Sequence, residues 1–239
     1  MCTEEAVREI LTLVADQRRQ FVLPVNVDVL VKFREAPSDV EFQSACRAAQ
    51  VVLADGMPIV WASRLLRRPL PGRVAGVDLL GALCVEMART GRTGFFLGAG
   101  PGIAARAAEA ISRRAPRFRL AGVHSPPLGF EHDSALNRIA VEAVNRAAPD
   151  FLFVALGPPR AEKWIHAHLP ILNVGVAMPV GGSFDILAGV VGRAPRLMRE
   201  TGLEWVWRLG HEPARLWRRY LSGAVQFLRL FRDEWGRVR

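Results

Sequence analysis

The chain alternates between short apolar runs and amphipathic stretches. Apolar runs with little polar alternation predict strands that are buried on both faces of a sheet. Stretches in which apolar residues recur every three or four positions predict helices. The predicted strands cover residues 21–25, 51–53, 93–97, 118–123, 151–156 and 172–180, and the predicted helices cover residues 3–19, 38–49, 57–66, 76–90, 103–114, 133–147 and 162–168.

This order of elements predicts an α/β fold. Strands and helices follow one another at the spacing of βα units, which indicates a mostly parallel sheet with helices on both faces. We assign this core to residues 1–192. The composition changes near Arg193, beyond which the chain is rich in arginine and tryptophan and has a helical pattern. Residues 193–239 are therefore predicted to form a basic helical appendage.

The last predicted helix has an apolar stripe. At about 100° per residue, six apolar side chains fall within roughly 80° of arc, with arginines on the other side: Trp217, Leu221, Ala224, Leu228, Phe231 and Trp235. Two interpretations stay open. The stripe packs on its own domain, or the helix lies on a membrane surface or closes over an anionic ligand.

The charge is concentrated in the same region. The chain has a formal net charge of +9. Residues 193–239 contain 11 arginines and five acidic residues, so +6 of that charge lies there. Such a basic end favours phosphate-bearing partners: nucleic acid, anionic lipid or a nucleotide substrate.

Other features narrow the class of protein. No apolar run approaches the ~20 residues of a membrane span, and no signal peptide is recognisable. Three widely spaced cysteines, Cys2, Cys46 and Cys84, fit neither a zinc site nor a disulfide framework. The five histidines show no metal-ligand spacing, so we expect no metal. These features predict a cytoplasmic protein with reduced thiols.

Residues 51–80 contain the strongest candidates for catalytic and phosphate-binding residues. Asp55 follows a predicted strand, and Arg73 lies in a glycine-containing turn shortly before Asp78. Parallel strands end at one edge of a sheet, and ligands bind outside that edge. Asp55 could be a helix cap or a general base. Arg73 could hold a phosphate with its planar guanidinium.

Two glycine-rich turns are further candidates. Gly98, Gly100 and Gly102 lie between a strand and a helix, where backbone N–H groups can bind phosphate. Their spacing is not the full dinucleotide fingerprint, and no acid ends a strand about 20 residues later. An unliganded tight turn is the other interpretation. Gly182 precedes Asp185, which could accept a hydrogen bond from a uracil or sugar, or cap a helix.

The motifs, taken in order, resemble the WecG/TagA/CpsF family of glycosyltransferases over about residues 21–221. They are Asn26-Val27-Asp28, Ala54-Asp55-Gly56, Arg73-x-x-Gly76-x-Asp78-Leu79, Phe96-Leu97-Gly98, Pro101-Gly102, Gly129-Phe130, Pro149-Asp150, Leu156-Gly157-x-Pro159-Arg160-x-Glu162, Gly182-x-Phe184-Asp185, Gly189, Arg193-Ala194-Pro195, Gly202-Leu203-Glu204-Trp205, Arg208 and Glu212-Pro213-x-Arg215-Leu216-x-Arg218-Arg219-Tyr220.

The resemblance implies a Rossmann-like core and an inverting glycosyltransferase. Such an enzyme moves a sugar from a UDP donor to a polyprenyl-diphosphate-linked saccharide, without metal or other cofactor. The products are bacterial cell-surface polymers such as wall teichoic acid, enterobacterial common antigen, capsule or exopolysaccharide. The resemblance also implies a cytoplasmic protein, peripheral at the inner face of the cell membrane, whose appendage contacts that surface. A homo-oligomer is possible in such a family.

The resemblance also assigns roles to residues of this chain. Asp55 would be the general base on the acceptor hydroxyl, and Arg73 would stabilise the diphosphate. Phe130 would stack on the uracil and Asp185 would bond it, while Asn26 would line the donor site. The remaining expected substrate-binding residues are Gly56, Gly76, Asp78, Gly98 and Gly182 in the core, and Arg208, Arg215 and Arg218 in the appendage.

Two positions depart from the family pattern. Pro24 stands where a threonine is usual, and Ala161 replaces a glutamine. Both positions belong to the pocket rim in the family, so the departures indicate a different donor sugar, reduced activity or a catalytically inactive paralogue.

Two other function classes match parts of the sequence. One is an NAD(P)-dependent oxidoreductase that uses the turn at Gly98 and Gly102, which the missing acid disfavours. The other is a nucleic-acid-binding module that uses the basic end. Because no recognition motif is present, we expect no nucleic-acid partner.

Overall fold

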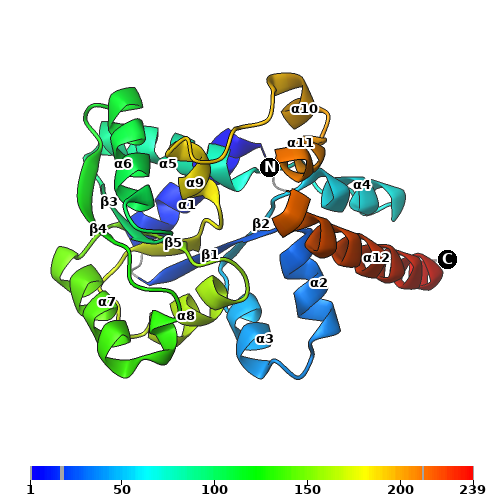
Figure 1. Ribbon diagram of the computed structural model, residues 1–239, viewed down its shortest axis with the longest axis horizontal. Coiled ribbons are helices and arrows are strands. Elements are labelled where there is room, and N and C mark those ends of the chain that lie inside the picture. Colours follow the sequence, from blue (N-terminus) through cyan, green and yellow to red (C-terminus); the bar gives the residue numbers. More distant parts are fainter. Residues whose placement is uncertain (1, 17–18, 212, 239) are drawn as a thin grey trace.

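The computed structural model describes residues 2–16, 19–211 and 213–238. Its centre is one sheet of six parallel strands in the order β2-β1-β6-β5-β3-β4 (Figure 1). This confirms the predicted α/β class with a parallel sheet. The strands are β1 (Gln20–Val25), β2 (Val51–Ala54), β3 (Thr93–Gly98), β4 (Arg119–His124), β5 (Phe151–Ala155) and β6 (Val176–Pro179).

The helices connect these strands and form the C-terminal end of the chain. They are α1 (Thr3–Asp16), α2 (Val27–Glu35), α3 (Val40–Arg47), α4 (Met57–Leu65), α5 (Gly76–Thr90), α6 (Ile103–Arg114), the 3₁₀ turn η1 (Phe130–His132), α7 (Ser134–Ala147), α8 (Arg160–His168), α9 (Ser183–Leu187), α10 (Arg196–Glu200), α11 (Glu204–His211) and α12 (Pro213–Val238).

Helix α2 is an element that the sequence pattern did not predict. Asn26 caps it, because its side-chain Oδ1 accepts a hydrogen bond from the Val29 backbone N–H at 3.1 Å. Val29 and Val31 are buried, which anchors the helix on the sheet. The strand predicted at 172–180 is shorter in the structure, where β6 begins at Val176. Leu172 and Val174 are buried in the core from the loop before it.

The sheet has a hydrophobic core on each face. One face is covered by α1, α5, α6 and α9, and the other by α3, α7 and α8 (Figure 1). On the first face the rings of Phe96 and Phe184 stack with centroids 4.6 Å apart. On the second face Phe130 packs against Trp164, with centroids 6.2 Å apart. Burial on both faces explains why the strands are continuous apolar runs.

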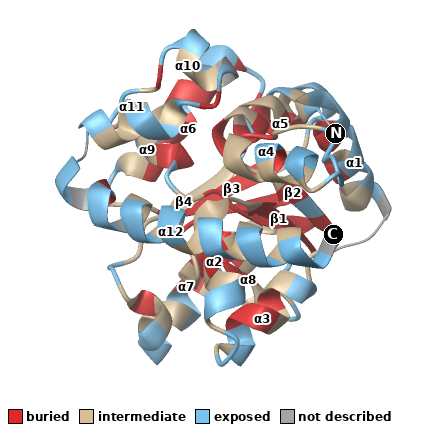
Figure 2. Ribbon diagram, turned by 90° about the vertical axis from the view of Figure 1, so that its right-hand side faces the viewer, coloured by how far each residue is buried: buried red, intermediate tan, exposed pale blue. Residues whose placement is uncertain are grey.

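The chain beyond residue 192 forms α10, α11 and α12. Helix α12 runs across α2 (Figure 2), and Arg34 pairs with Glu234 at 3.4 Å where the two helices meet. Helix α11 is preceded by Gly202, which packs directly on Met57 and Trp61 of α4. The appendage thus contacts the core through α2 and α4. Where one domain ends and the next begins stays a prediction.

The predicted apolar stripe of α12 is divided between two environments. Phe231 and Trp235 are half-buried, whereas Trp217, Leu221 and Leu228 are exposed. Only part of the stripe therefore packs on this chain's own core.

The turn after β3 is built around Gly98. Its φ is +95°, and a Cβ placed there would lie 2.7 Å from the Ala155 carbonyl oxygen of the neighbouring strand β5. Moving a backbone atom of a central strand would disturb the hydrogen bonds and packing of the sheet. Packing alone therefore requires glycine at this position.

Gly98→Ala is expected to lower the free energy of unfolding by about 2–4 kcal/mol, because it adds a strained φ to a backbone clash. Gly102→Ala is the matched control: its φ is +74°, but nothing lies within 4 Å of its added Cβ. The control is expected to cost about 1–2 kcal/mol. Urea unfolding of both variants measures the difference, and equal losses would contradict the packing argument.

Candidate active site

The candidate site lies at the edge of the sheet where the strands have their carboxyl ends. Asp55 directly follows β2, and its backbone N–H donates to the Val25 carbonyl at 2.8 Å. This bond fixes the start of the turn to the end of β1. Gly56 then has a φ of +150°, a conformation that favours glycine, and leads into α4.

The carboxylate of Asp55 lies against the start of α5. It accepts a hydrogen bond from the backbone N–H of Gly76, the first residue of that helix. A Cβ at Gly76 would lie 3.3 Å from Asp55 Oδ2 and 3.7 Å from the buried Ser183 Oγ. Glycine at position 76 therefore lets the helix terminus approach the carboxylate closely.

Asp55 has the acid–base property that a general base needs. Burial raises the pKa of Asp55 from 3.8 to about 6, although part of the residue reaches solvent. The Gly76 N–H, Arg208 and Arg73 act in the opposite direction, while Glu204 raises the pKa further. The carboxyl is therefore ionised at neutral pH, with a pKa close enough to neutrality for efficient proton transfer.

Three charged side chains connect the core to the appendage beside Asp55. Arg73 Nη1 lies 3.5 Å from Glu204 Oε2, and Arg208 Nη2 lies 3.1 Å from Glu204 Oε1. Arg73 is 17% exposed and Glu204 14% exposed, so their contact is largely shielded from water. Arg208 thus comes from α11 to the same place that Arg73 reaches from the core.

Asp78 makes a different contact. It forms an ion pair with Arg193, which lies in the segment that leads to the appendage. The pair joins the first turn of α5 to that segment. The substrate-binding role expected for Asp78 stays a prediction, and it would have to coexist with Arg193.

Asn26 and Gly182 both lie where strands end. The side chain of Asn26 caps α2, and Gly182 precedes α9. Asp185 is half-buried one turn later, and its Oδ2 lies 3.7 Å from the position of a Cβ on Gly182. That is an ordinary contact distance, so the Asp185 carboxylate lies beside the Gly182 backbone without requiring glycine there.

Phe130 is not presented as a stacking platform. Its side chain is only 1% exposed and packs in the core against Trp164. Glu131, the next residue, is clamped to Arg160 by a two-point ion pair that holds the η1 turn. The expectation that this ring stacks on uracil therefore needs correction: in this arrangement no face of the ring is open to a ligand.

The appendage arginines do not all gather at Asp55. Arg218 is exposed, and its guanidinium lies 5.4 Å from the ring centroid of Trp217 on the same helix. Its charge is not among those that shift the pKa of Asp55. Arg215 was also expected at the site, but its side chain lies outside the described residues.

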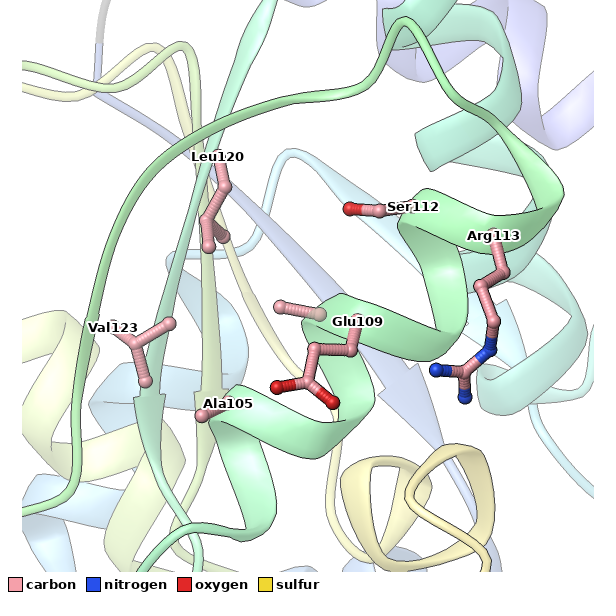
Figure 3. A pocket seen from close by; sticks show the side chains of 7 residues that line it. Ala105, Glu109, Ser112, Arg113, Leu120 and Val123 are labelled. Atoms are coloured by element: carbon pink, nitrogen blue, oxygen red, sulfur yellow. The ribbon is translucent and has the colours of Figure 1, made fainter.

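A hollow elsewhere on the molecule has no comparable chemistry. It lies between α6 and the edge strand β4, at the opposite end of the sheet from β2 (Figure 3). Small and apolar side chains line most of it, with one acid, Glu109, and one base, Arg113. Neither comes from the carboxyl end of a strand, and Asp55 is not part of the lining.

The described residues offer no metal cage or membrane span. No three His, Cys, Asp or Glu side chains among them come together in a way that could hold a metal ion. Within the same described ranges, no helix is both long enough and apolar enough to cross a bilayer.

Comparisons with known proteins give the family. A model of the glycosyl transferase WecG/TagA/CpsF family matches residues 1–239. The chain belongs to this family. It is 33% identical over 212 residues to the N-acetylglucosaminyldiphosphoundecaprenol N-acetyl-beta-D-mannosaminyltransferase of Bacillus spizizenii, covering 88% of this chain and 79% of that protein. The enzyme of the same name from Staphylococcus aureus is 30% identical over 207 residues, covering 85% and 78%.

Family membership confirms the resemblance and makes this chain a glycosyltransferase. It also removes support from the oxidoreductase interpretation of the turn after β3. Gly98 is explained by its close approach to β5, and Gly102 by its left-handed conformation before α6.

Three residues next to the predicted site had no assigned role in the sequence analysis. Glu204 bridges the two arginines, Arg193 pairs with Asp78, and Ser183 lies behind Gly76. Glu204 and Arg193 occur in motifs that carry the family resemblance. The signal that could have found them is charge balance, because two half-buried arginines beside one carboxylate require another anion.

The two departures from the family pattern are both buried. Ala161 is 1% exposed and packs in the same core as Phe130 and Trp164. Pro24 is buried within β1 and lies opposite Leu53 of β2. Neither residue carries a charge, and neither is among the groups that shift the pKa of Asp55, so neither departure removes a group from the charge cluster described above.

The raised pKa of Asp55 should appear in the stability of the protein. Below about pH 4 the carboxyl is protonated in both folded and unfolded chains. As the pH rises from about 4 to 6, the unfolded chain releases its proton more readily, so the folded state loses stability. Asp55→Asn removes this loss. The variant is expected to be more stable than the wild type by up to about 3 kcal/mol at pH 7.5, and by much less at pH 4.5.

Urea unfolding of both proteins at the two pH values provides the measurement. Asparagine keeps an oxygen that can accept from Gly76, so the variant is a close structural match. A difference in stability that does not change with pH would show that Asp55 titrates normally.

Proposed function

We propose that this chain is an inverting, metal-independent transferase that moves a sugar from a UDP donor to a polyprenyl-diphosphate-linked saccharide. The single observation that carries the proposal is the position of Asp55, a carboxylate with a pKa near 6, beside Arg73 and Arg208. The chemistry needs one base and one site of positive charge, and both are present in the cluster.

The proposed step is a single displacement. The acceptor hydroxyl attacks the anomeric carbon from the face opposite the leaving group, and Asp55 takes the hydroxyl proton. The new glycosidic bond forms as the bond to the UDP oxygen breaks. The diphosphate leaves with its electron pair, and its negative charge develops next to Arg73 and Arg208. Arginine can stabilise that charge because its planar donors match phosphate oxygens.

The relatives suggest the substrates to test first. The similar proteins are named as N-acetylmannosaminyl transferases that act on N-acetylglucosaminyl-diphospho-undecaprenol. We therefore propose N-acetylmannosamine on UDP as the first donor, and that polyprenyl-linked saccharide as the first acceptor. The product would serve a bacterial cell-surface polymer.

The site of action follows from the acceptor. A polyprenyl chain stays in the bilayer, so an enzyme that uses it must work at the membrane surface. The basic charge of residues 193–239 suits an anionic surface. We propose that the chain works in the cytoplasm, peripherally bound at the inner face of the cell membrane.

Asp55→Asn is expected to reduce the transfer rate by about 10²–10⁴-fold, the usual contribution of a general base. The wild-type kcat/KM is expected to rise with pH through an apparent pKa of about 6 and then level off, because only ionised Asp55 accepts the proton. Transfer of labelled N-acetylmannosamine to the lipid-linked acceptor measures both. Asp133→Asn, which changes a carboxylate that caps α7, is the control and should keep full activity. A fully active Asp55→Asn variant would remove the base from the mechanism.

Arg73→Ala is expected to weaken UDP binding by about 10–100-fold, since hydrogen bonds to charged groups contribute about 1.5–3 kcal/mol. Isothermal titration with UDP, with and without EDTA, tests the diphosphate role and metal independence together. Arg89→Ala, an exposed arginine at the end of α5, is the control and should bind like the wild type. If binding disappears in EDTA, a metal ion carries the diphosphate instead.

A further inference from the structure

The end of α4 and the loop that follows it, residues 64–70, carry an unusual exposed surface. Arg64, Arg67 and Arg68 are exposed, and none of them forms an ion pair with a described residue. Between and beside them stand Leu65, 58% exposed, and Leu70, 38% exposed. Large apolar side chains interleaved with unpaired arginines need a partner that offers both negative charge and apolar contact.

This loop has a defined shape. The Arg68 N–H donates to the Ser63 carbonyl at 2.9 Å, and the Leu70 N–H donates to Ser63 Oγ at 3.0 Å. Ser63 Oγ in turn donates to the Val60 carbonyl at 2.8 Å. The structure therefore holds the arginines and leucines in the same short segment of surface.

Helix α12 carries a second surface of the same kind. Trp217, Leu221, Val225 and Leu228 are exposed at helical spacing, and Arg218, Arg229 and Arg232 are exposed on the same helix. Helices α4 and α12 extend from the same side of the molecule (Figure 1), the side that faces the viewer in Figure 2. The contact of Gly202 with Trp61 also joins α4 to the start of α11.

We propose that the α4 loop, residues 64–70, is a second membrane-contacting element that works together with the exposed face of α12 on an anionic bilayer. The inference rests on the proposed function, because it concerns how that active site reaches a lipid-linked acceptor. Arginines bind the lipid phosphates, and the leucines and Trp217 enter the boundary between headgroups and acyl chains.

Charge favours a bilayer over a second copy of this chain. The chain has a net charge of +9, and a symmetric dimer through this face would bring the arginines of two copies together. An anionic bilayer reverses that repulsion. It also buries the leucines, which a purely ionic partner would leave in water.

The position of the loop connects the bilayer to the chemistry. Arg73 comes three positions after Leu70, so their Cα atoms lie at most about 11 Å apart. Arg73 contacts Glu204 beside Asp55. If Leu70 lies in the headgroup region, the diphosphate of an acceptor anchored in the same bilayer is close to Arg73 and Arg208, the arginines proposed to stabilise negative charge.

The test is co-sedimentation of the full chain with vesicles of phosphatidylcholine containing 30% phosphatidylglycerol, and with phosphatidylcholine alone. The triple variant Arg64→Gln, Arg67→Gln, Arg68→Gln is expected to bind the anionic vesicles roughly 100-fold more weakly. Each arginine near an anionic surface contributes about fivefold. The matched control is Arg113→Gln, Arg114→Gln, Arg117→Gln, which removes the same charge from exposed positions at the end of α6 and beyond. It is expected to bind within about threefold of the wild type.

A second variant separates charge from insertion. Leu65→Ser with Leu70→Ser keeps all arginines and is expected to weaken binding to anionic vesicles by about tenfold or more, because two exposed side chains no longer enter the bilayer. If both the arginine triple and the leucine double bind like the wild type, the proposal is overturned. It is also overturned if sedimentation without lipid shows a dimer that the triple variant dissociates, since a second copy would then cover this face.

The failure of this inference can be told apart from failure of the proposed function. UDP binding in lipid-free solution reports on the active site and is expected to be unchanged in both loop variants. Normal UDP binding together with normal vesicle binding by both loop variants would overturn only the membrane role of the loop. If the loop variants lose vesicle binding but the wild type binds no UDP, the membrane role of the loop is supported and the proposed transferase function is overturned.

Discussion

The contact on which the site depends is the bridge from Arg73 through Glu204 to Arg208. Arg73 belongs to the core, while Glu204 and Arg208 belong to the appendage, so this bridge aligns the two parts next to Asp55. Removing only Glu204 would leave two arginines without their anion, and removing one arginine would leave a half-buried carboxylate. Partly buried charges of this kind are stable only as a set.

The same bridge affects the protonation of Asp55, the proposed base. Two arginines favour ionisation of Asp55, and Glu204 together with burial opposes it. Two arginines beside one carboxylate also suit the proposed reaction, in which a diphosphate arrives and departs, because their planar guanidinium groups can donate to phosphate oxygens.

The sequence predicted the helices, the strands and the position of single residues better than the contacts between residues that are far apart in the chain. Periodicity gave α5 its correct bounds and a parallel sheet, because both follow from which residues are buried. The position of Asp55 after a strand was equally visible. By contrast, Phe130 looked like a ligand platform because its motif matches the family, whereas only the packing against Trp164 shows that it is buried. Arg193 with Asp78 joins residues 115 positions apart, which no local pattern reveals.

The close packing at Gly202 limits how this chain can evolve. A Cβ on Gly202 would lie 2.5 Å from the Cβ of Met57 and 3.0 Å from Trp61. Any side chain there would push α11 away from α4 and carry Arg208 with it. The contact is with the Cβ of Met57, which every residue except glycine has, and Gly202 also has a φ of +78°. A shorter side chain at position 57 or 61 therefore does not make room for alanine, and position 202 is confined to glycine.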